Sequence, residues 1–316
     1  MNTKVKNIIS VTLCVVLSVC TYAYLCIIVT PKDINDSGGA LYYNGMGFLA
    51  EPKNSLDIVV YGNSDVYSGF APAVLFEKFG YTSYASGRAH QNVGHINKLL
   101  KKTLKNQKPK LVILEADCFF AKSKQEINKA DIVYAPFVYH SRWKEIKARD
   151  FYKLPSRKGR KDINKGYINS NKTNKSGWKE NYMGNPNAKP KQIPERNLKY
   201  IEECIEICKA NDIKVMLLEL PSATSWTYAK HNAVNMLAKS HNIPFIDMNT
   251  ELEGYEVDFK KDFRDNGNHL NKTGALKSTE YIGAFIKKNY SGLIKNKYNN
   301  PQYEHWLKVV ESYNRK

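Results

Sequence analysis

Hydrophobic and polar residues alternate along the chain in a pattern that predicts five buried strands separated by helices. Each short apolar run has the length of a strand and is followed by polar residues. These runs are Leu56–Tyr61, Tyr81–Ala85, Lys110–Glu115, Lys214–Glu219 and Pro244–Asp247. Buried strands that alternate with helices are typical of a parallel sheet covered on both faces. We therefore expect an α/β fold with three layers and about five parallel strands.

Amphipathic segments between and after these runs predict the helices. Their approximate ranges are Pro72–Phe79, Asn92–Lys105, Pro194–Ala210, Trp226–Ser240 and Thr273–Lys288. Gly80 directly follows the first range and is a typical residue at the end of a helix. The alternation breaks between residues 118 and 192, which are rich in Lys, Arg, Asn, Tyr and Gly. We interpret this stretch as an insertion within a domain that covers residues 55–316.

The N-terminal region predicts a membrane anchor. Residues 8–30 form an apolar run without a charged side chain. About 22 helical residues span roughly 33 Å, which is the thickness of a bilayer core. Lys4 and Lys6 precede the run and favour a cytoplasmic N-terminus, with the remainder of the chain outside the cell. We expect an anchor in residues 1–30 and a connector in residues 31–54; a cleaved signal peptide is the alternative.

The chain of 316 residues carries a formal net charge of +18, which favours binding to a polyanion. Nucleic acid would suit this charge, but the predicted export argues against it. An anionic membrane surface or a cell-wall polymer remains. The basic cluster at residues 157–161 is either an ordinary solvated surface or a patch that holds such a polymer.

Two polar motifs carry the candidate chemistry. Ser64 follows the first predicted strand, and His269 lies in a polar loop between the last strand and the last helix. A serine hydroxyl becomes a nucleophile when a histidine removes its proton and a carboxylate orients that histidine. Asp265 and Asp262 are both candidates for the carboxylate. Sites in parallel sheets gather at the carboxyl ends of the strands, where both motifs fall. Alternatively, Ser64 only caps the next helix and the acids are ordinary loop charges.

Acyl transfer from an ester also needs hydrogen-bond donors for the oxyanion. The backbone N–H groups of Ser64 and Gly87 are candidates, since a glycine permits close approach. The side chains of Asn63, Arg88 and Gln91 are further candidates. Gly87 is equally consistent with an ordinary turn glycine. We expect neither a cofactor nor a metal ion.

These motifs resemble those of the SGNH/GDSL hydrolases, over roughly residues 55–290. Gly62–Asp65 is similar to the first block of the family, usually Gly-Asp-Ser, with Asn63 in place of the Asp. Gly87 corresponds to the glycine of the second block. Asn268–Asn271 is similar to the late block that contains the catalytic histidine. The resemblance implies a flavodoxin-like three-layer fold and a Ser-His-Asp acyl-enzyme mechanism.

The chain departs from this family in two places. The third block, Gly-x-Asn-Asp, is replaced by Glu115–Asp117. Asp265 precedes His269 by four residues rather than three, and Asn266 holds the usual position of the Asp. The first departure removes the usual Asn donor, and the second leaves the orienting carboxylate open between Asp265 and Asp262.

Three segments are similar to a Gram-positive branch of the superfamily, namely Tyr139–Trp143, Asp150–Phe151 and Lys165–Tyr167. Related proteins are the D-alanyl-lipoteichoic acid transfer protein and the alginate and peptidoglycan O-acetyltransferases. The resemblance implies one anchor, an extracytoplasmic domain and a membrane-bound O-acyltransferase as a partner.

Our leading hypothesis is an extracytoplasmic serine esterase or O-acyltransferase that acts on acyl esters of a cell-envelope polysaccharide. One alternative is a non-catalytic envelope protein that binds glycopolymer or scaffolds an assembly, which the missing third block favours. Another is an unanchored, lipase-like esterase, which requires cleavage of the N-terminal segment.

Overall fold

The chain folds as two units. The computed structural model describes residues 2–32, 36–39, 45–121, 133–155, 162–174 and 179–315. Unit 1 comprises Met1–Asn44 and Ile127–Arg160, and unit 2 comprises Gly45–Glu126 and Lys161–Lys316. The predicted insertion at residues 118–192 is thereby divided between the two units. The predicted basic cluster at residues 157–161 lies outside the described residues.

Unit 2 is built around one parallel sheet of five strands. The strands are β1 (Ile58–Gly62), β2 (Ser83–Gly87), β3 (Leu111–Glu115), β4 (Lys214–Glu219) and β5 (Phe245–Asp247). Their order across the sheet is β2-β1-β3-β4-β5, and every neighbouring pair is parallel. The predicted α/β fold is confirmed, and the order is that of a flavodoxin-like sheet. Ligands in such sheets bind where the order reverses, here at the carboxyl ends of β1 and β3.

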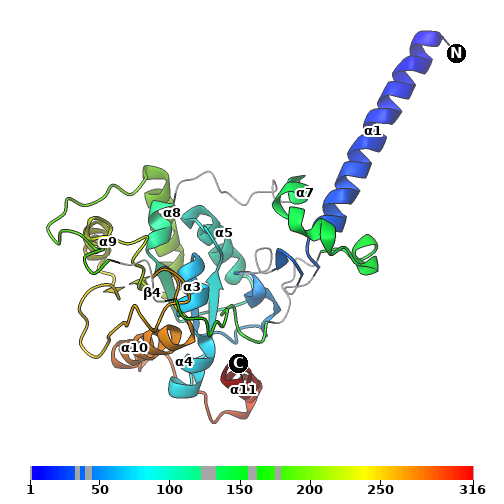
Figure 1. Cartoon of the computed structure of the whole chain (residues 1–316). Coiled ribbons are helices and arrows are strands. Elements are labelled where there is room, and N and C mark those ends of the chain that lie inside the picture. The colour runs from blue at the N-terminus through cyan, green and yellow to red at the C-terminus, as the bar shows by residue number, and fades with distance from the viewer. Residues whose placement is uncertain are drawn as a thin grey trace. The chain divides into compact units, whose positions relative to one another are not determined.

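Helices cover both faces of this sheet (Figure 1). The helices of unit 2 are α3 (Ser64–Gly69), α4 (Pro72–Phe79), α5 (Val93–Thr103), α8 (Glu195–Lys209), α9 (Tyr228–His241), α10 (Lys272–Tyr290) and α11 (His305–Arg315), with short 3-10 helices η1 (Gly47–Ala50), η2 (Asp117–Phe120) and η6 (Pro301–Tyr303). One face packs against α5, α8 and α9, and the other packs against α3, α4 and α10.

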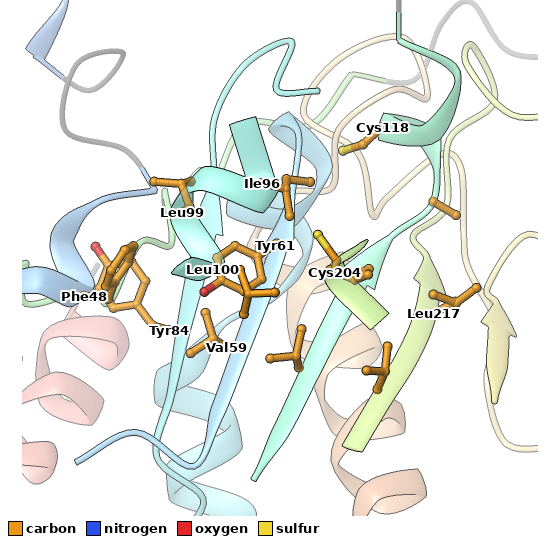
Figure 2. Close-up of a cluster of buried hydrophobic side chains, with 14 of the residues drawn as sticks. Phe48, Val59, Tyr61, Tyr84, Ile96, Leu99, Leu100, Cys118, Cys204 and Leu217 are labelled. Carbon is orange, nitrogen blue, oxygen red and sulfur yellow. The ribbon is translucent and has the colours of Figure 1, made fainter. Parts of the chain in front are cut away.

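Residues of β1 show how two cores arise from one apolar run. Ile58 and Val60 point into the core beneath α4 and α10, while Val59 and Tyr61 point into the opposite core. Figure 2 shows the second group beside the apolar face of α5. All four side chains are buried. A strand that is buried on both faces must be apolar at every position, which explains the continuous run in the sequence.

Local signals set the ends of several helices. Gly80, with a φ of 70°, ends α4 as predicted. The Asn92 side chain caps α5 by accepting from the His95 N–H. Asn271 caps α10 by accepting from the Gly274 N–H at 3.1 Å. Each cap satisfies a backbone group that the helix itself leaves unpaired.

Unit 1 contains the N-terminal helix α1 (Thr3–Val29), whose 27 residues are long and apolar enough to cross a membrane. Three short helices pack against it: α7 (Ala135–Val138), η4 (His140–Lys144) and η5 (Ala148–Phe151). Two of the segments that resemble the Gram-positive branch, Tyr139–Trp143 and Asp150–Phe151, fall in these short helices. In unit 1 they serve to pack the segment against α1.

We predict that Gly62→Ala destabilises unit 2. A Cβ at this position would lie 2.5 Å from the Glu115 Cβ and would also collide with Val66. Overpacking of this kind costs about 1–3 kcal/mol of unfolding free energy. Thermal unfolding of the purified protein measures the effect. Gly292→Ala is the matched control, because nothing lies within 4 Å of its Cβ; equal melting temperatures for the two variants would contradict the prediction.

Candidate active site

Ser64 lies just beyond the carboxyl end of β1 and is the first residue of α3. Asn63 is the N-cap of α3, and its side-chain oxygen accepts from the Asp65 N–H at 2.7 Å. Ser64 is therefore the first helical residue and not the cap. The alternative that Ser64 serves only as a helix cap is wrong, because Asn63 fills that role.

Asn63 also ties this turn to the carboxyl end of β3. Its backbone N–H donates to Glu115 Oε2 at 3.1 Å, and its side-chain Nδ2 donates to Asp117 Oδ2 at 3.2 Å. Both acceptors belong to the segment Glu115–Asp117, which follows β3 and begins with its last residue. The turn that carries Ser64 is thus fixed by groups from two neighbouring strands.

The last residue of β2 and the residues after it support the same turn. A Cβ on Gly87 would lie 2.8 Å from the Asn63 carbonyl oxygen and 2.9 Å from the Tyr67 nitrogen, so only glycine fits beside α3. Gln91 Nε2 donates to the carbonyls of Gly62 and Ser86 at 2.9 and 3.0 Å. Both hydrogens of this amide are therefore engaged, which fits support of the loop better than donation to an oxyanion. Arg88 is buried beside His95, whose pKa burial and the Arg88 charge lower to about 3.

The late loop forms a histidine–carboxylate pair. His269 Nδ1 lies 2.5 Å from Asp265 Oδ2. The other oxygen of Asp265 accepts from the backbone N–H groups of Asn268 and His269, at 3.1 and 2.7 Å. Gly267, with a φ of 76°, lets the loop fold back so that a spacing of four residues brings the two side chains together.

Asp262 has different partners. Its Oδ2 accepts from Lys277 Nζ and from the Asp258 N–H, each at 2.7 Å. The side chain is fully buried. Of the two carboxylates considered from the sequence, Asp265 contacts His269, and Asp262 joins its loop to α10. The catalytic role of Asp265 remains a prediction.

A pocket of about 430 Å³ joins Ser64 to the late loop. Its lining residues are Asn63, Ser64, Asp65, His90, Gln91, Asp117, Cys118, Ala121, Ser225 and Asn268. Asn268 contacts the imidazole of His269 through its side-chain amide. Nothing in the sequence distinguishes Asn268 from any other asparagine in a loop. A pocket of this volume is large enough for a small organic ligand.

A second connection runs beneath Ser64 through Tyr67 and Arg264. The Arg264 guanidinium lies 5.7 Å from the ring centre of Tyr67 in α3. Burial raises the pKa of the Tyr67 hydroxyl, and Arg264 and Ser64 oppose this shift. The Arg264 N–H in turn donates to the His269 carbonyl at 3.0 Å. In the described part of the chain no hydrogen bond joins Ser64 Oγ directly to His269. Such a bond often forms only when substrate is bound.

Tyr67, His90, Arg264 and Asn268 are among the residues of this site that were not predicted. His90 adopts a φ of 55°, which is uncommon for residues other than glycine, and it lines the pocket. Strained backbone of this kind concentrates at functional sites. The sequence offers no local signal for it, since the conformation depends on the fold around β2.

Burial lowers the pKa of His269 below 6.5, although the adjacent Asp265 opposes this shift. Partial burial alone would raise the pKa of Asp265, but hydrogen bonds from His269 and the backbone lower it overall. At neutral pH the pair is therefore a neutral imidazole beside a carboxylate. That is the protonation state a general base requires.

A group of carboxyl residues, here called the floor, consists of Asp65 and Asp117, which line the pocket, and of the fully buried Glu115 and Glu219 at the ends of β3 and β4. Burial, together with the charge of Asp117, raises the pKa of Glu115 to about 7. Burial, followed by the charge of Glu115, raises the pKa values of Asp65 and Glu219 well above their usual range. These shifts favour the protonated, neutral forms of these three carboxyl groups.

Asp65, Glu115 and Asp117 are the residues that could hold a metal ion, because one oxygen of each lies within 4.8 Å of the others. Protein donors already occupy much of this cluster. Glu115 accepts from the N–H groups of Asn63 and Asp117 and from Cys118 Sγ, the last two at 2.8 Å. Lys230 Nζ lies 2.5 Å from Asp117 Oδ1. The arrangement fits protonated acids and one ion pair without requiring a cation.

No family profile and no curated relative matches the sequence. Among solved structures, the chain is similar to a presumed acylhydrolase from Bacteroides fragilis, with 17% identity, a TM-score of 0.42 and coverage of 79% of this chain and 97% of that chain. A GDSL-like lipase from Bacteroides thetaiotaomicron shows 16% identity, a TM-score of 0.37 and coverage of 75% and 88%. A family 3 carbohydrate esterase from Clostridium thermocellum shows 13% identity, a TM-score of 0.39 and coverage of 76% and 99%. At these identities and TM-scores, only the residues of the site bear on the function.

We predict that Glu115 makes stability depend on pH. A carboxyl group whose pKa is about 7 in the folded chain and 4.5 in the unfolded chain stabilises the fold fully below pH 4.5. This contribution, on the order of 3 kcal/mol, is lost as the pH rises through 7. Glu115→Gln cannot titrate, so its melting temperature should fall less between pH 5 and pH 8 than that of the wild type.

The exposed Glu251 supplies the matched control, because Glu251→Gln should leave the pH dependence of the wild type unchanged. If Glu115→Gln and Glu251→Gln follow the same melting curve against pH as the wild type, Glu115 is already ionised in the folded protein and the prediction is wrong.

Proposed function

We propose that the protein is a membrane-anchored serine esterase or O-acyltransferase of the SGNH/GDSL type, which acts on acyl esters of a cell-envelope polysaccharide. The observation that carries this proposal is the Asp265–His269 pair, at 2.5 Å, in the loop that shares a pocket with Ser64. A scaffold would not need a neutral imidazole oriented by a carboxylate beside a serine at a strand end. The anchor in α1 and the charge of +18 favour a substrate at the membrane or in the wall.

In the proposed first step, Ser64 Oγ attacks the carbonyl carbon of the ester. His269 accepts the hydroxyl proton at Nε2, since its Nδ1 is held by Asp265. The carbon–oxygen bond to the leaving alcohol then breaks, and His269 returns the proton to that alcohol. The acyl group remains on Ser64 as an ester.

In the second step an acceptor hydroxyl attacks the acyl-enzyme, again with His269 as general base and then acid. Water as the acceptor gives hydrolysis, and a sugar hydroxyl gives transfer. The backbone N–H groups of Ser64 and Gly87 are the proposed donors to the oxyanion in both steps. The second hydrogen of Asn63 Nδ2 is a further proposed donor, because among the described residues this nitrogen donates to Asp117 Oδ2 alone.

We predict that Ser64→Ala and His269→Ala abolish acyl release from p-nitrophenyl acetate, because each removes a group that reacts directly. Loss of either member of such a pair lowers kcat by about 10⁶-fold in a well-studied serine protease. The assay uses the full-length protein in detergent, with acetylated or unacetylated glycan as a possible acceptor. Acyl groups that appear on the glycan establish transfer.

Ser225→Ala is the matched control, since Ser225 lines the same pocket and its hydroxyl bonds to Ser222 rather than to a histidine. It should retain activity and labelling of the protein by a fluorophosphonate. No turnover by the wild type and no labelling of Ser64 would instead support the non-catalytic alternative.

We also predict that Asp265→Asn and Asp262→Asn separate catalysis from stability. Asp265→Asn removes the acceptor that fixes the His269 tautomer, so kcat should fall by up to about 10⁴-fold. Asp262→Asn weakens the ion pair to Lys277 and should lower the melting temperature while largely sparing kcat. In the wild type, kcat/KM should rise with pH through a value below 6.5, because the pKa of His269 is lowered. If Asp262→Asn lowered kcat and Asp265→Asn lowered only the melting temperature, Asp262 would be the carboxylate that orients His269.

A further inference from the structure

The segment of residues 133–155, here called the juxtamembrane segment, has its polar groups inside and its apolar groups outside. Arg142 and Asp150 are fully buried and form an ion pair at 2.7 Å. The neighbouring side chains of Trp143, Phe151 and Tyr152 are exposed by 45%, 52% and 79%. In water this distribution is unfavourable, because apolar area stays hydrated while charges lose their hydration.

Exposed apolar residues concentrate in this segment. Among the described residues outside α1, eleven large hydrophobic side chains are exposed, and seven of them belong to the juxtamembrane segment. These seven are Val133, Tyr134, Phe137, Trp143, Phe151, Tyr152 and Leu154. Contiguous exposed apolar surface marks a site of contact with a partner or a membrane.

The segment is bound to one end of the apolar helix. Tyr22 Oη donates to the Val133 carbonyl at 2.5 Å, and Tyr24 Oη donates to the Phe151 carbonyl at 2.9 Å. Arg142 Nε donates to the Val29 carbonyl at 3.3 Å. Figure 1 shows α7 beside the C-terminal end of α1. The position of the segment along α1 is therefore fixed by its contacts between residues 22 and 29.

The length of α1 then fixes the depth of these contacts. A hydrocarbon core of about 30 Å takes about 20 helical residues. Lys6 is the last charged residue before the apolar run, so a span that begins at Ile8 ends near Ile27. Tyr22 lies about five residues, or roughly 7 Å, before that end. Anything bonded to Tyr22 and Tyr24 must therefore sit at the boundary between acyl chains and headgroups.

The chemistry of the exposed surface suits this boundary. Trp and Tyr are enriched at membrane interfaces, where one part of the ring is apolar and the other is hydrated. Lys144, Lys147 and Lys153 are exposed in the same segment and would meet anionic headgroups. The apolar side chains continue the exposed apolar surface of α1.

We propose that the juxtamembrane segment lies in the membrane interface around the C-terminal end of α1, with its aromatic side chains among the lipids. The inference rests on the proposed function only through the membrane anchor. Arg142 holds the segment in place from within, because it bonds both to the end of α1 and to Asp150. The lipid surface is the occupant that the depth, the aromatic residues and the lysines favour together.

Fluorescence of Trp143 in vesicles tests this proposal. The full-length protein and Trp143→Phe are reconstituted in phosphatidylcholine with phosphatidylglycerol, with or without bromine at the 6,7 positions of the acyl chains. The difference in emission between the two proteins belongs to Trp143. We expect brominated lipid to remove most of this difference and aqueous iodide to remove little of it. Trp143→Phe keeps an aromatic ring at an exposed position, so folding should be preserved.

A second comparison uses exposed positions only. Phe137→Ser, Tyr152→Ser and Leu154→Ser together should restore iodide access to Trp143, whereas the exposed control pair Met236→Ser and Leu307→Ser in unit 2 should not. Extraction of the vesicles with alkaline carbonate tests the anchor separately. A protein that stays in the membrane but exposes Trp143 to iodide overturns the proposal and leaves the anchor intact.

Release by carbonate would overturn both the anchor and this inference, without bearing on the labelling of Ser64. Protection of Trp143 in native membranes but not in pure lipid vesicles would also overturn the proposal, because it would identify a protein as the occupant.

Discussion

The candidate site depends on the hydrogen bonds of Asn63. This one residue caps α3, accepts from the Asp65 N–H, and donates from its backbone and side chain to Glu115 and Asp117. Because these bonds join β1 to the end of β3, the turn between them has little freedom. Ser64 is the next residue along the chain, so its position is set before any substrate arrives. Precise placement of a nucleophile by packed and bonded neighbours is what makes such a group effective.

The same bonds create an electrostatic difficulty that burial resolves. The proposed acyl transfer would develop negative charge on the substrate oxygen, and ionised carboxylates near Ser64 would oppose that charge. Burial instead raises the pKa of Glu115 to about 7 and those of Asp65 and Glu219 well above their usual range. The floor is therefore closer to neutral than its composition indicates. The Lys230–Asp117 pair compensates a further carboxylate.

The fold was predictable because it follows from local patterns, whereas much of the site was not. Apolar runs of strand length and Gly80 report backbone conformation directly, so the sheet and the end of α4 could be expected. β2 begins at Ser83, two residues later than expected, because register depends on pairing with β1. α11 was missed. Its Trp306 is buried by stacking on Phe76 at 5.2 Å, a tertiary contact that periodicity does not report.

In the site, Ser64, His269 and Asp265 could be predicted from the sequence because each follows a recognisable strand or precedes a recognisable helix. Tyr67 and Arg264 connect the two motifs, yet they lie almost 200 residues apart and neither belongs to a motif. His90 enters the pocket only because its backbone adopts a φ of 55°. The arginine and glutamine after β2 were expected to bind an oxyanion, but Gln91 instead holds two backbone carbonyls.

The two departures from the family pattern have physical explanations that bear on the choice between an enzyme and a decayed scaffold. An aspartate at position 63 would add a carboxylate next to those of Glu115 and Asp117. The Asn63 side chain instead donates a hydrogen bond to Asp117. The missing third block and the altered first block are thus complementary. Likewise, the longer spacing between Asp265 and His269 is absorbed by the turn at Gly267, and the pair still meets at 2.5 Å. These contacts support the proposed enzyme over the proposed scaffold, because the turn that carries Ser64 and the Asp265–His269 pair are both held in place.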